Sequence, residues 1–277
     1  MNKNIMIIGA GGSLGRVLCD LFVENKYNVI AIDKDENSIA YLYRVCNLPR
    51  KNIYIEDICN FDMLKRIIEY HKIDIVVNCA ALKHVLWCEY NIKHAIDVNI
   101  FANLEIINYL KKEKKKFIFI SSDKAINPTN VYALTKQFTD YITSLYNFKI
   151  VRGVNLLNSK GSVLNIWDEQ KEKKVFTVID NEKCARYFMF LSQMADIVKT
   201  AVESKDFIVE YTPQVVYKIY IYDLFKAYLK MNNILNYKVK NISLCDNEKI
   251  IEDLNFKAKI KEIRDVDKIV SLLEENK

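Results

Sequence analysis

Hydroxyl and ionisable side chains gather in one short stretch of the chain, SSDKAINPTNVYALTK. Its Tyr132 and Lys136 are four positions apart, so on a helix they share one face. A lysine ammonium beside a phenol favours the phenolate, which would make Tyr132 a general base near neutral pH. Ser122, Asp123 and Lys124 add a hydroxyl, a carboxyl group and a second amine. We therefore expect these residues to form a catalytic group, although a polar loop before an ordinary exposed helix has the same pattern.

The residues around this stretch predict how it is positioned. The apolar run over residues 117–120 is typical of a buried strand. The catalytic residues that follow it would emerge at the carboxyl end of that strand, where open parallel sheets place their chemistry. Asn127-Pro128 predicts a turn, and we expect a helix over residues 132–146.

A second group of residues predicts a dinucleotide site. The apolar residues 4–8 lead into GAGGSLG (residues 9–15), and helical periodicity follows over residues 16–25. Strand, glycine turn and helix form the context that such a site requires. Gly9 would allow the tight turn, Gly12 the close approach of a pyrophosphate, and Gly15 the packing of helix on strand. The pyrophosphate would lie at the N-terminus of the helix.

Acidic residues at the next strand ends predict which dinucleotide binds. Residues 28–32 form a strand that ends in Asp33, which would accept hydrogen bonds from ribose hydroxyls and repel a 2′-phosphate. This favours NAD, while the neighbouring Lys34 leaves NADP possible. Asp57 follows the strand of residues 53–55 and would meet the adenine. The predicted cofactor-binding residues are Gly9, Gly12, Ser13, Leu14, Gly15, Asp33, Lys34, Asp57, Ile58, Ala80, Ala81, Lys83, Asn99, Tyr132 and Lys136.

The alternation of strands and helices predicts the fold class. A helix over residues 61–70, a strand over 73–78 that opens into Cys79-Ala80-Ala81, and a helix over 95–112 continue the pattern. We expect an α/β, Rossmann-like, doubly wound parallel sheet with right-handed crossovers. Residues 1–150 would be the NAD(P)-binding domain, and residues 151–277 a smaller substrate-binding portion, partly interleaved with it.

Composition excludes several classes of protein. The 277 residues are 51% hydrophobic and 27% charged, as in globular proteins, and the net charge of +6 is spread out. This suits an anionic ligand and does not predict nucleic-acid binding. The seven cysteines form no CxxC pair and predict reduced thiols in a cytoplasmic protein. We expect no metal, no signal peptide and no membrane span. We also expect a homo-oligomer, a dimer or larger.

With these residues in view, the chain resembles the extended short-chain dehydrogenases/reductases that act on nucleotide sugars. More narrowly, it resembles the inverting UDP-N-acetylglucosamine 4,6-dehydratases of the polysaccharide-biosynthesis family. The motifs that carry the resemblance are the glycine turn, AALKHV (80–85) with CEYN (88–91), SDKAINPTN (122–130), RGVN (152–155), GSV (161–163) and RYFM (186–189). NEK (247–249), with Glu252 and Leu254, matches a near-terminal motif more weakly.

The resemblance implies a role for each candidate residue. Tyr132, with Lys136, would take the proton of the sugar 4-hydroxyl while hydride passes to the nicotinamide. Asp123 would protonate the departing 6-hydroxyl, Lys124 would remove the proton at C5, and Ser122 would hydrogen-bond the reacting oxygen. NAD would be regenerated in each cycle and stay tightly bound. The implied substrate-binding residues are Lys83, His84, Asn155, Ser162, Val163 and Arg186, and Arg152 would help to hold the sugar diphosphate.

The chain departs from the family pattern where glycines and prolines shape loops. Leu86 and Ile92 stand in place of prolines, and Ala133 stands in place of a glycine. The hexose, the nucleotide and inversion at C5 therefore stay open. One alternative is an NAD-dependent sugar-nucleotide epimerase or C4 dehydrogenase, which needs no Asp–Lys pair for elimination. Another is a non-catalytic dinucleotide-binding regulator. The resemblance favours a dehydratase that serves surface polysaccharide or glycan biosynthesis.

Overall fold

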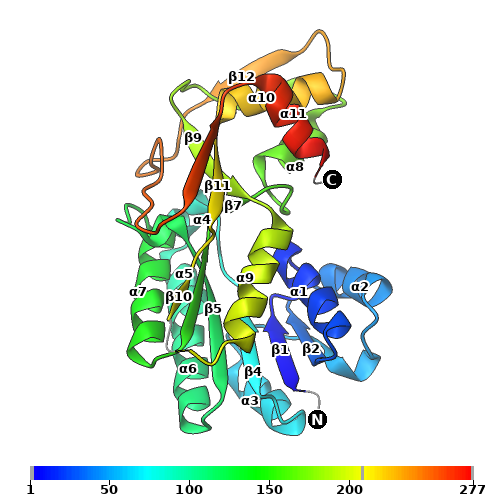
Figure 1. Ribbon diagram of the computed structural model, residues 1–277, viewed down its shortest axis with the longest axis vertical. Helices are drawn as coiled ribbons and strands as arrows, with labels where there is room; N and C mark the ends of the chain where they lie inside the picture. Colours follow the sequence, from blue (N-terminus) through cyan, green and yellow to red (C-terminus); the bar gives the residue numbers. More distant parts are fainter. Residues whose placement is uncertain (1–2, 207–208, 276–277) are drawn as a thin grey trace.

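The computed structural model describes residues 3–206 and 209–275 and is built around a parallel sheet (Figure 1). The strands lie in the order β10-β6-β5-β4-β1-β2-β3, and every neighbouring pair is parallel. They are β1 (Asn4–Ile8), β2 (Asn28–Asp33), β3 (Ile53–Ile55), β4 (Ile75–Asn78), β5 (Lys116–Ser122), β6 (Lys149–Gly153) and β10 (Glu210–Tyr211). The chain order reverses between β1 and β4, and ligands bind at such a reversal, beyond the carboxyl ends of the strands.

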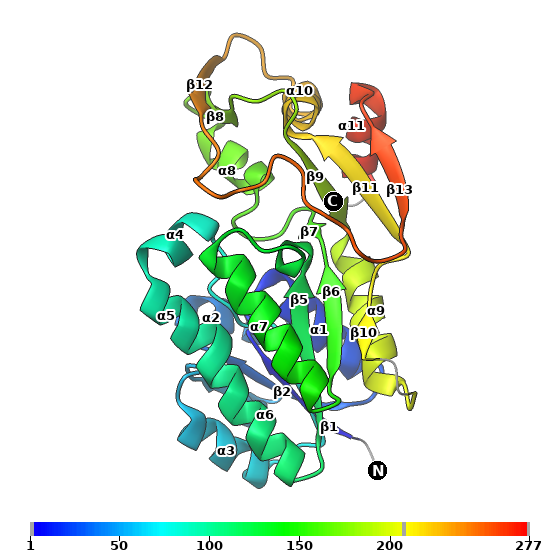
Figure 2. The same ribbon diagram turned by 90° about the vertical axis from the view of Figure 1, so that its left-hand side faces the viewer.

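Helices cover both faces of this sheet (Figure 2). Alternate side chains of the strands pack against them. Ile5 and Ile7 face a core shared with α1 (Ser13–Glu24), α2 (Glu36–Val45) and α9 (Leu191–Glu203). Met6 and Ile8 face the opposite core, shared with α3 (Phe61–Tyr70), α6 (Ala102–Lys112) and α7 (Val131–Leu145). Because both faces are buried, the strands are continuous apolar runs.

A smaller lobe lies above the carboxyl ends of the strands (Figure 1). It contains a four-stranded sheet in the order β13-β11-β9-β7 and the strand pair β12-β8. Its elements are β7 (Asn155–Leu156), α8 (Val163–Gln170), β8 (Val175–Ile179), β9 (Ala185–Met189), β11 (Val215–Tyr220), α10 (Ile221–Met231), β12 (Lys238–Ile242), β13 (Lys259–Ile263) and α11 (Val266–Glu274). The aromatic rings of Trp167, Phe176, Phe225 and Tyr228 form its buried centre, with centroids 5.1 to 6.1 Å apart.

The predicted α/β fold class is confirmed, and most predicted elements lie within two residues of their observed bounds. The first helix begins three residues earlier than expected, at Ser13. Residues 95–112 are helical throughout, as expected, but they do not form one regular α-helix. Helix α5 (Ile92–Ile96) continues through a π-helical turn (Asp97–Phe101) into α6. Such turns put an extra residue into a helix and often mark functional sites. The sequence interpretation also missed α2 and α4 (Val85–Tyr90).

The chain crosses between sheet and lobe more than once. Residue 150 lies inside β6, and α9 and β10, from the later part of the chain, pack on or join the large sheet. The division into residues 1–150 and 151–277 therefore stays a prediction. Within the described residues, no helix is both long and apolar enough to cross a membrane. The seven cysteines, all described, carry free thiols.

Candidate active site

A cavity of about 840 Å³ lies between the carboxyl edge of the large sheet and the lobe. The glycine turn and the ends of β2, β4 and β5 line one side of it, and the chain around β7 and α8 lines the other. All but three of the predicted site residues line this one cavity, and the exceptions are Asn99, Asp123 and Arg152. The structure thus brings the predicted cofactor, catalytic and substrate residues together.

The backbone of the glycine turn leaves no room for a side chain at Gly9 or Gly15. Gly9 has a φ of +79°, and a Cβ there would lie 2.7 Å from the nitrogen of Ala80. A Cβ on Gly15 would lie 2.1 Å from the carbonyl oxygen of Gly9. Gly12 is the N-cap of α1 and has no side chain to accept from the first N–H groups of the helix. The helix N-terminus and the close backbone approach fit a dinucleotide pyrophosphate.

The acidic residues beside the turn also fit a dinucleotide. The Asp33 carboxylate accepts hydrogen bonds from the nitrogens of Gly11, at 2.9 Å, and Asp35, at 3.0 Å, which orient it at the cavity wall. Lys34 lies 3.6 Å from Asp57 in an ion pair that is partly exposed. The Asp57 carboxylate partly neutralises the charge of Lys34 and so weakens the electrostatic attraction of Lys34 for a 2′-phosphate.

Asn99 has a different role from the one that we expected. It lies in the π-helical turn and is 1% exposed. Its amide accepts from the nitrogen of Leu82, donates to the carbonyl of Leu82, and donates to Thr135. Because these bonds engage the side chain inside the protein, Asn99 holds the loop after β4 in place and does not face the cavity.

The start of α7 fixes the position of Tyr132. Asn130 caps the helix, since its Oδ1 accepts from the nitrogen of Ala133 at 2.9 Å. The carboxylate of Glu89, in α4, accepts from the nitrogen of Val131 at 2.7 Å. Tyr132 and Lys136 then lie one turn apart at the cavity wall, as the spacing predicts, and they are 8% and 5% exposed.

The electrostatics of this pair differ from the prediction. Burial raises the pKa of Tyr132 well above its usual 10, although a hydrogen bond with Ser122 opposes the rise. Burial lowers the pKa of Lys136 from 10.5 to about 8. The Lys136 ammonium donates to the carbonyl of Ile120 at 2.8 Å and lies 4.4 Å from the centre of the Phe119 ring. The expectation that Lys136 favours the Tyr132 phenolate is therefore wrong for this structure, because burial raises the pKa of Tyr132 and the group that opposes the rise is Ser122.

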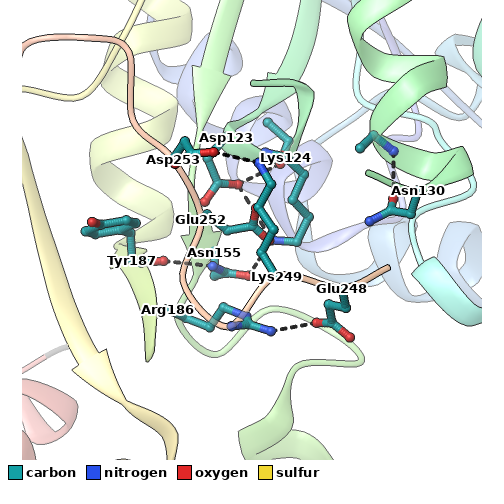
Figure 3. A network of polar contacts seen from close by, with 12 residues as sticks. Asp123, Lys124, Asn130, Asn155, Arg186, Tyr187, Glu248, Lys249, Glu252 and Asp253 are labelled. Atoms are coloured by element: carbon teal, nitrogen blue, oxygen red, sulfur yellow. Dashed lines mark hydrogen bonds and ion pairs between the residues drawn. The ribbon is translucent and has the colours of Figure 1, made fainter. Parts of the chain in front are cut away.

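Ser122, Asp123 and Lys124 form one connected polar group at the end of β5. Figure 3 shows Asp123 and Lys124 beside each other. The Ser122 hydroxyl donates to Asp123 Oδ1 at 2.9 Å, and the Lys124 ammonium lies 3.6 Å from the same oxygen. Asp123 is fully buried, and its Oδ2 has no partner among the described residues. Ser122 and Lys124 both line the cavity. The carboxyl group of Asp123 is thus one hydrogen bond behind the cavity wall, and Ser122 connects it to the cavity.

The lobe contributes a second helix N-terminus to the cavity. Ser162 is the N-cap of α8, and its buried hydroxyl oxygen has no partner among the described residues. Val163 begins the helix beside it. Lys83 donates to the carbonyl of Lys160 at 2.7 Å, and His84 packs against Gly161, so both approach this turn from the other side. An unused donor, a helix N-terminus and a lysine together suit an anionic group.

The two arginines differ in what they contact. Arg186 lines the cavity, but its guanidinium already donates to Glu248 at 2.7 Å and to the carbonyl of Ile250 at 2.9 Å. Arg152 lies in a separate hollow, where it pairs with Asp140 at 2.9 Å and with Glu210 at 2.5 Å. The expectation that Arg152 holds the sugar diphosphate is corrected, because both carboxylates engage its buried guanidinium.

Sequence reasoning missed the acidic side of this site. Glu248 lines the cavity, and Glu252 lies 3.5 Å from the Lys124 ammonium. Both belong to the near-terminal motif, but the sequence alone did not say what they contact. In the described part of the chain, no group of three or more histidine, cysteine or acidic residues could hold a metal ion.

Comparison with known proteins agrees with this geometry. The model of the family described as "Polysaccharide biosynthesis protein" matches residues 5–274. A protein of Methanocaldococcus jannaschii, named an uncharacterized membrane protein, is 33% identical over 72% of this chain and 63% of its own length. An inverting UDP-N-acetylglucosamine 4,6-dehydratase of Campylobacter jejuni is 33% identical over 58% of this chain and 52% of its own. A UDP-glucose 4-epimerase of Rickettsia conorii is 28% identical over 73% and 63%. The chain thus spans between half and two thirds of the length of these relatives.

Solved structures show the same fold. Pen from Bacillus thuringiensis superposes with a TM-score of 0.88 and 25% identity, covering 99% of this chain and 98% of that one. The dTDP-glucose 4,6-dehydratase DesIV from Streptomyces venezuelae, with NAD and TYD bound, superposes with a TM-score of 0.81 and 14% identity, covering 91% and 88%. At these identities the likeness to DesIV supports the fold alone.

Proposed function

We propose that this chain, which belongs to the polysaccharide biosynthesis protein family, is an NAD-dependent nucleotide-sugar 4,6-dehydratase. The observation that carries the proposal is the connected group of Ser122, Asp123 and Lys124 beside Tyr132. Dehydration needs both an acid and a base beyond the pair that serves oxidation. We further propose UDP-N-acetylglucosamine as the substrate, as in the name of the Campylobacter relative, for surface polysaccharide or glycan biosynthesis.

The residues of the chain divide the reaction among them. Tyr132 would take the proton of the 4-hydroxyl, with Ser122 hydrogen-bonded to its phenol and Lys136 one turn away. The positive charge of an oxidised nicotinamide beside it would favour the phenolate and oppose the effect of burial on its pKa. Lys124, as its neutral amine, would take the proton at C5 and later supply the proton that returns to C5. Asp123, in its protonated form, would give a proton to the Ser122 hydroxyl, with which it shares a hydrogen bond, as that hydroxyl gives its own proton to the 6-hydroxyl, which leaves as water. NAD, held by the glycine turn and Asp33, would supply the hydride acceptor for C4 and the hydride donor for C6, so it would be regenerated in each cycle and stay tightly bound.

Two helix N-termini at one cavity support a substrate with a diphosphate. The N-terminus of α1, at the glycine turn, would hold the pyrophosphate of NAD. The N-terminus of α8, with the unpartnered Ser162 hydroxyl, would hold the diphosphate of the sugar nucleotide, and Lys83 would add positive charge. His84, Asn155 and Arg186 line the same cavity and would contact the sugar or its phosphates.

The cofactor preference rests on Asp33 and Lys34. The Asp33 carboxylate is held at the cavity wall, where it would accept from ribose hydroxyls and repel a 2′-phosphate. The contact of Lys34 with Asp57 supports NAD over NADP. The NAD named with the DesIV structure is in line with this choice.

The experiment that tests the proposal separates oxidation from elimination. Purified protein is incubated with UDP-N-acetylglucosamine and NAD, and the product is identified by NMR. A 4-keto-6-deoxy sugar nucleotide is expected, and its C5 configuration reports inversion. Asp123→Asn should still oxidise substrate and accumulate reduced nicotinamide, measured by near-ultraviolet absorbance, while product formation falls about 10²- to 10⁴-fold. Tyr132→Phe should not oxidise the substrate and should accumulate no reduced nicotinamide. Wild-type turnover in Asp123→Asn would reject the dehydratase.

A sugar-nucleotide epimerase is the second candidate, because a UDP-glucose 4-epimerase is among the relatives. An epimerase would use Tyr132 and Lys136 for oxidation at C4. It would have no elimination step in which Asp123 and Lys124 transfer protons. Release of a C4 epimer without loss of water would support it. A protein that binds NAD but leaves every sugar nucleotide unchanged would be a non-catalytic regulator.

We also propose a cytoplasmic homo-oligomer, consistent with the free thiols. An exposed apolar stripe along α7, formed by Leu134, Phe138, Tyr141 and Leu145, supports self-association, since these side chains are 50 to 65% exposed. They recur at helical spacing on one face. Light scattering of the purified protein measures the oligomer, and a monomer at micromolar concentration would contradict it.

A further inference from the structure

We propose that Glu252 is a positioning residue of the acid–base group: its carboxylate holds the Lys124 amine beside Asp123, both before the amine takes the C5 proton and as the ammonium that results. The inference rests on the proposed function, because it assigns Glu252 to the step in which Lys124 takes the C5 proton. Nothing in the spacing of the catalytic stretch points to Glu252, which lies more than a hundred residues further along the chain.

The Lys124 nitrogen lies among three oxygen acceptors from three parts of the chain (Figure 3). Glu252 Oε1 is 3.5 Å away, Asp123 Oδ1 is 3.6 Å away, and Asn155 Oδ1 is 3.4 Å away. The side chains of Glu252 and Asp123 are 4% and 0% exposed, and that of Lys124 is 13% exposed. Solvent screens these charges little, so the two carboxylates determine where the ammonium lies.

The segment that carries Glu252 is fixed to the catalytic loop on one side. The hydroxyl of Thr129 donates to the carbonyl of Asn247 at 2.6 Å. The ammonium of Lys249 donates to the carbonyl of Ile126 at 2.9 Å. These bonds join the segment to residues on both sides of the Asn127-Pro128 turn. Glu252 is thus held at a defined position relative to the catalytic loop.

The same segment is fixed to the lobe on its other side. Arg186, on β9, donates to the Glu248 carboxylate and to the carbonyl of Ile250. The nitrogen of Ala185 also donates to the carbonyl of Ile250, at 3.1 Å. With both sides fixed, the backbone that carries Glu252 cannot move away from Lys124 without breaking bonds elsewhere in the segment, and a fixed backbone is what a positioning group requires.

The charges in this cluster distinguish Glu252 from a simple surface partner. Burial raises the pKa of Glu252, and the nearby Asp123 raises it further, while Lys124, Arg186 and Lys249 lower it. Glu248 already pairs with Arg186, so Asp123 and Glu252 share the single ammonium of Lys124. Without the charge of Glu252, only Asp123 and Asn155 would attract the Lys124 nitrogen, which would then shift away from its present position.

Glu252→Gln tests the proposal, with Asp253→Asn as the matched control. The control makes the same chemical change at the adjacent position, where the carboxylate is half-exposed and pairs with Lys249. In Glu252→Gln we expect kcat for product to fall about 10- to 100-fold, as a displaced reacting group costs, with KM changed less than about twofold. Reduced nicotinamide should accumulate, and the acid limb of the pH–kcat profile should move. Asp253→Asn should match wild type in all of these.

Glu252→Asp keeps the charge and should restore part of the lost kcat. If Glu252→Gln turns over like wild type with an unchanged pH profile, the proposal is overturned. If Glu252→Asp loses as much kcat as Glu252→Gln, keeping the carboxylate charge does not restore activity, and the proposal is overturned too.

A second measurement does not depend on turnover. The Lys124 amine is acylated with limiting acetic anhydride, and the labelled peptide is quantified by mass spectrometry. Loss of a carboxylate at 3.5 Å disfavours the ammonium, so labelling should be faster in Glu252→Gln than in wild type and in Asp253→Asn. Equal labelling would refute the contact with Lys124. If wild type makes no 4-keto product while labelling still responds, the proposed function fails and the Glu252–Lys124 contact stands.

Discussion

Lys136 is a buried cation whose cost to the fold can be measured. It is 5% exposed, and burial lowers its pKa from 10.5 to about 8, although Asp140, Cys79 and Cys88 oppose this. We predict that replacing Lys136 with methionine, which has a similar length and no charge, makes the free energy of unfolding depend on pH differently from wild type.

The size and sign of the effect follow from the pKa of Lys136. Below about pH 8 the amine is protonated in both the folded and the unfolded chain, and the fold bears the cost of burying it. Between about pH 8 and pH 10.5 the folded protein releases the proton before the unfolded chain does, so wild-type stability rises with pH. Each pKa unit is worth about 1.4 kcal/mol, which gives about 3 kcal/mol over the whole window.

The assay is urea unfolding of wild type and Lys136→Met at several pH values from 7 to about 10.5, the upper end of that window. The free energy of unfolding of wild type minus that of Lys136→Met should increase by about 3 kcal/mol as the pH rises. Groups shared by both proteins cancel in the difference. Lys112→Met, at the exposed end of α6, serves as a control and should follow wild type. Parallel curves for wild type and Lys136→Met would refute the reasoning.

Three further substitutions test the cavity wall and the lobe. Gly15→Ala should abolish NAD binding in calorimetry and lower the unfolding temperature, because its Cβ would lie 2.1 Å from the Gly9 carbonyl oxygen; retained NAD affinity would contradict the described packing. Asp33→Ala should weaken NAD binding by about 1.5–3 kcal/mol, the value of hydrogen bonds to a charged group, and tighter binding of NADP than of NAD by wild type would reject the assignment. Trp167→Ala should cost about 3–5 kcal/mol in urea unfolding, since its ring is fully buried and its Nε1 donates to the Thr177 carbonyl; a loss under 1 kcal/mol would show that the lobe repacks.

The elements that sequence predicts well are those that local patterns determine. Strand β1 has the expected bounds because its apolar run ends directly at Gly9, where the backbone must turn at positive φ. The spacing of Gly12 and Gly15 works in the same way, since both approach the carbonyl oxygen of Gly9 a few residues away, whereas Gly9 itself approaches the backbone of the distant Ala80. The register of Tyr132 and Lys136 follows from the period of a helix.

Burial and long-range pairing are what local patterns leave out. Spacing places Lys136 on the face of Tyr132, but only the packed structure shows how much water is excluded from the two side chains. The side chain of Arg152 suits a phosphate, but Asp140 and Glu210, from other elements, engage it. A run of helical periodicity over residues 95–112 could not show the π-helical turn, which forms where Asn99 binds the loop after β4.

The near-terminal segment shows why such a site cannot be read from one motif. Glu248 and Glu252 are four positions apart, and one contacts Arg186 of the lobe while the other contacts Lys124 of the large sheet. Neither contact is encoded by the segment alone, because each depends on where β9 and β5 end in space. A single short segment therefore ties the position of an arginine that lines the cavity to the position of Lys124, the proposed catalytic base. The packing of the lobe against the sheet and the geometry of the proposed acid–base group are consequently parts of the same set of contacts.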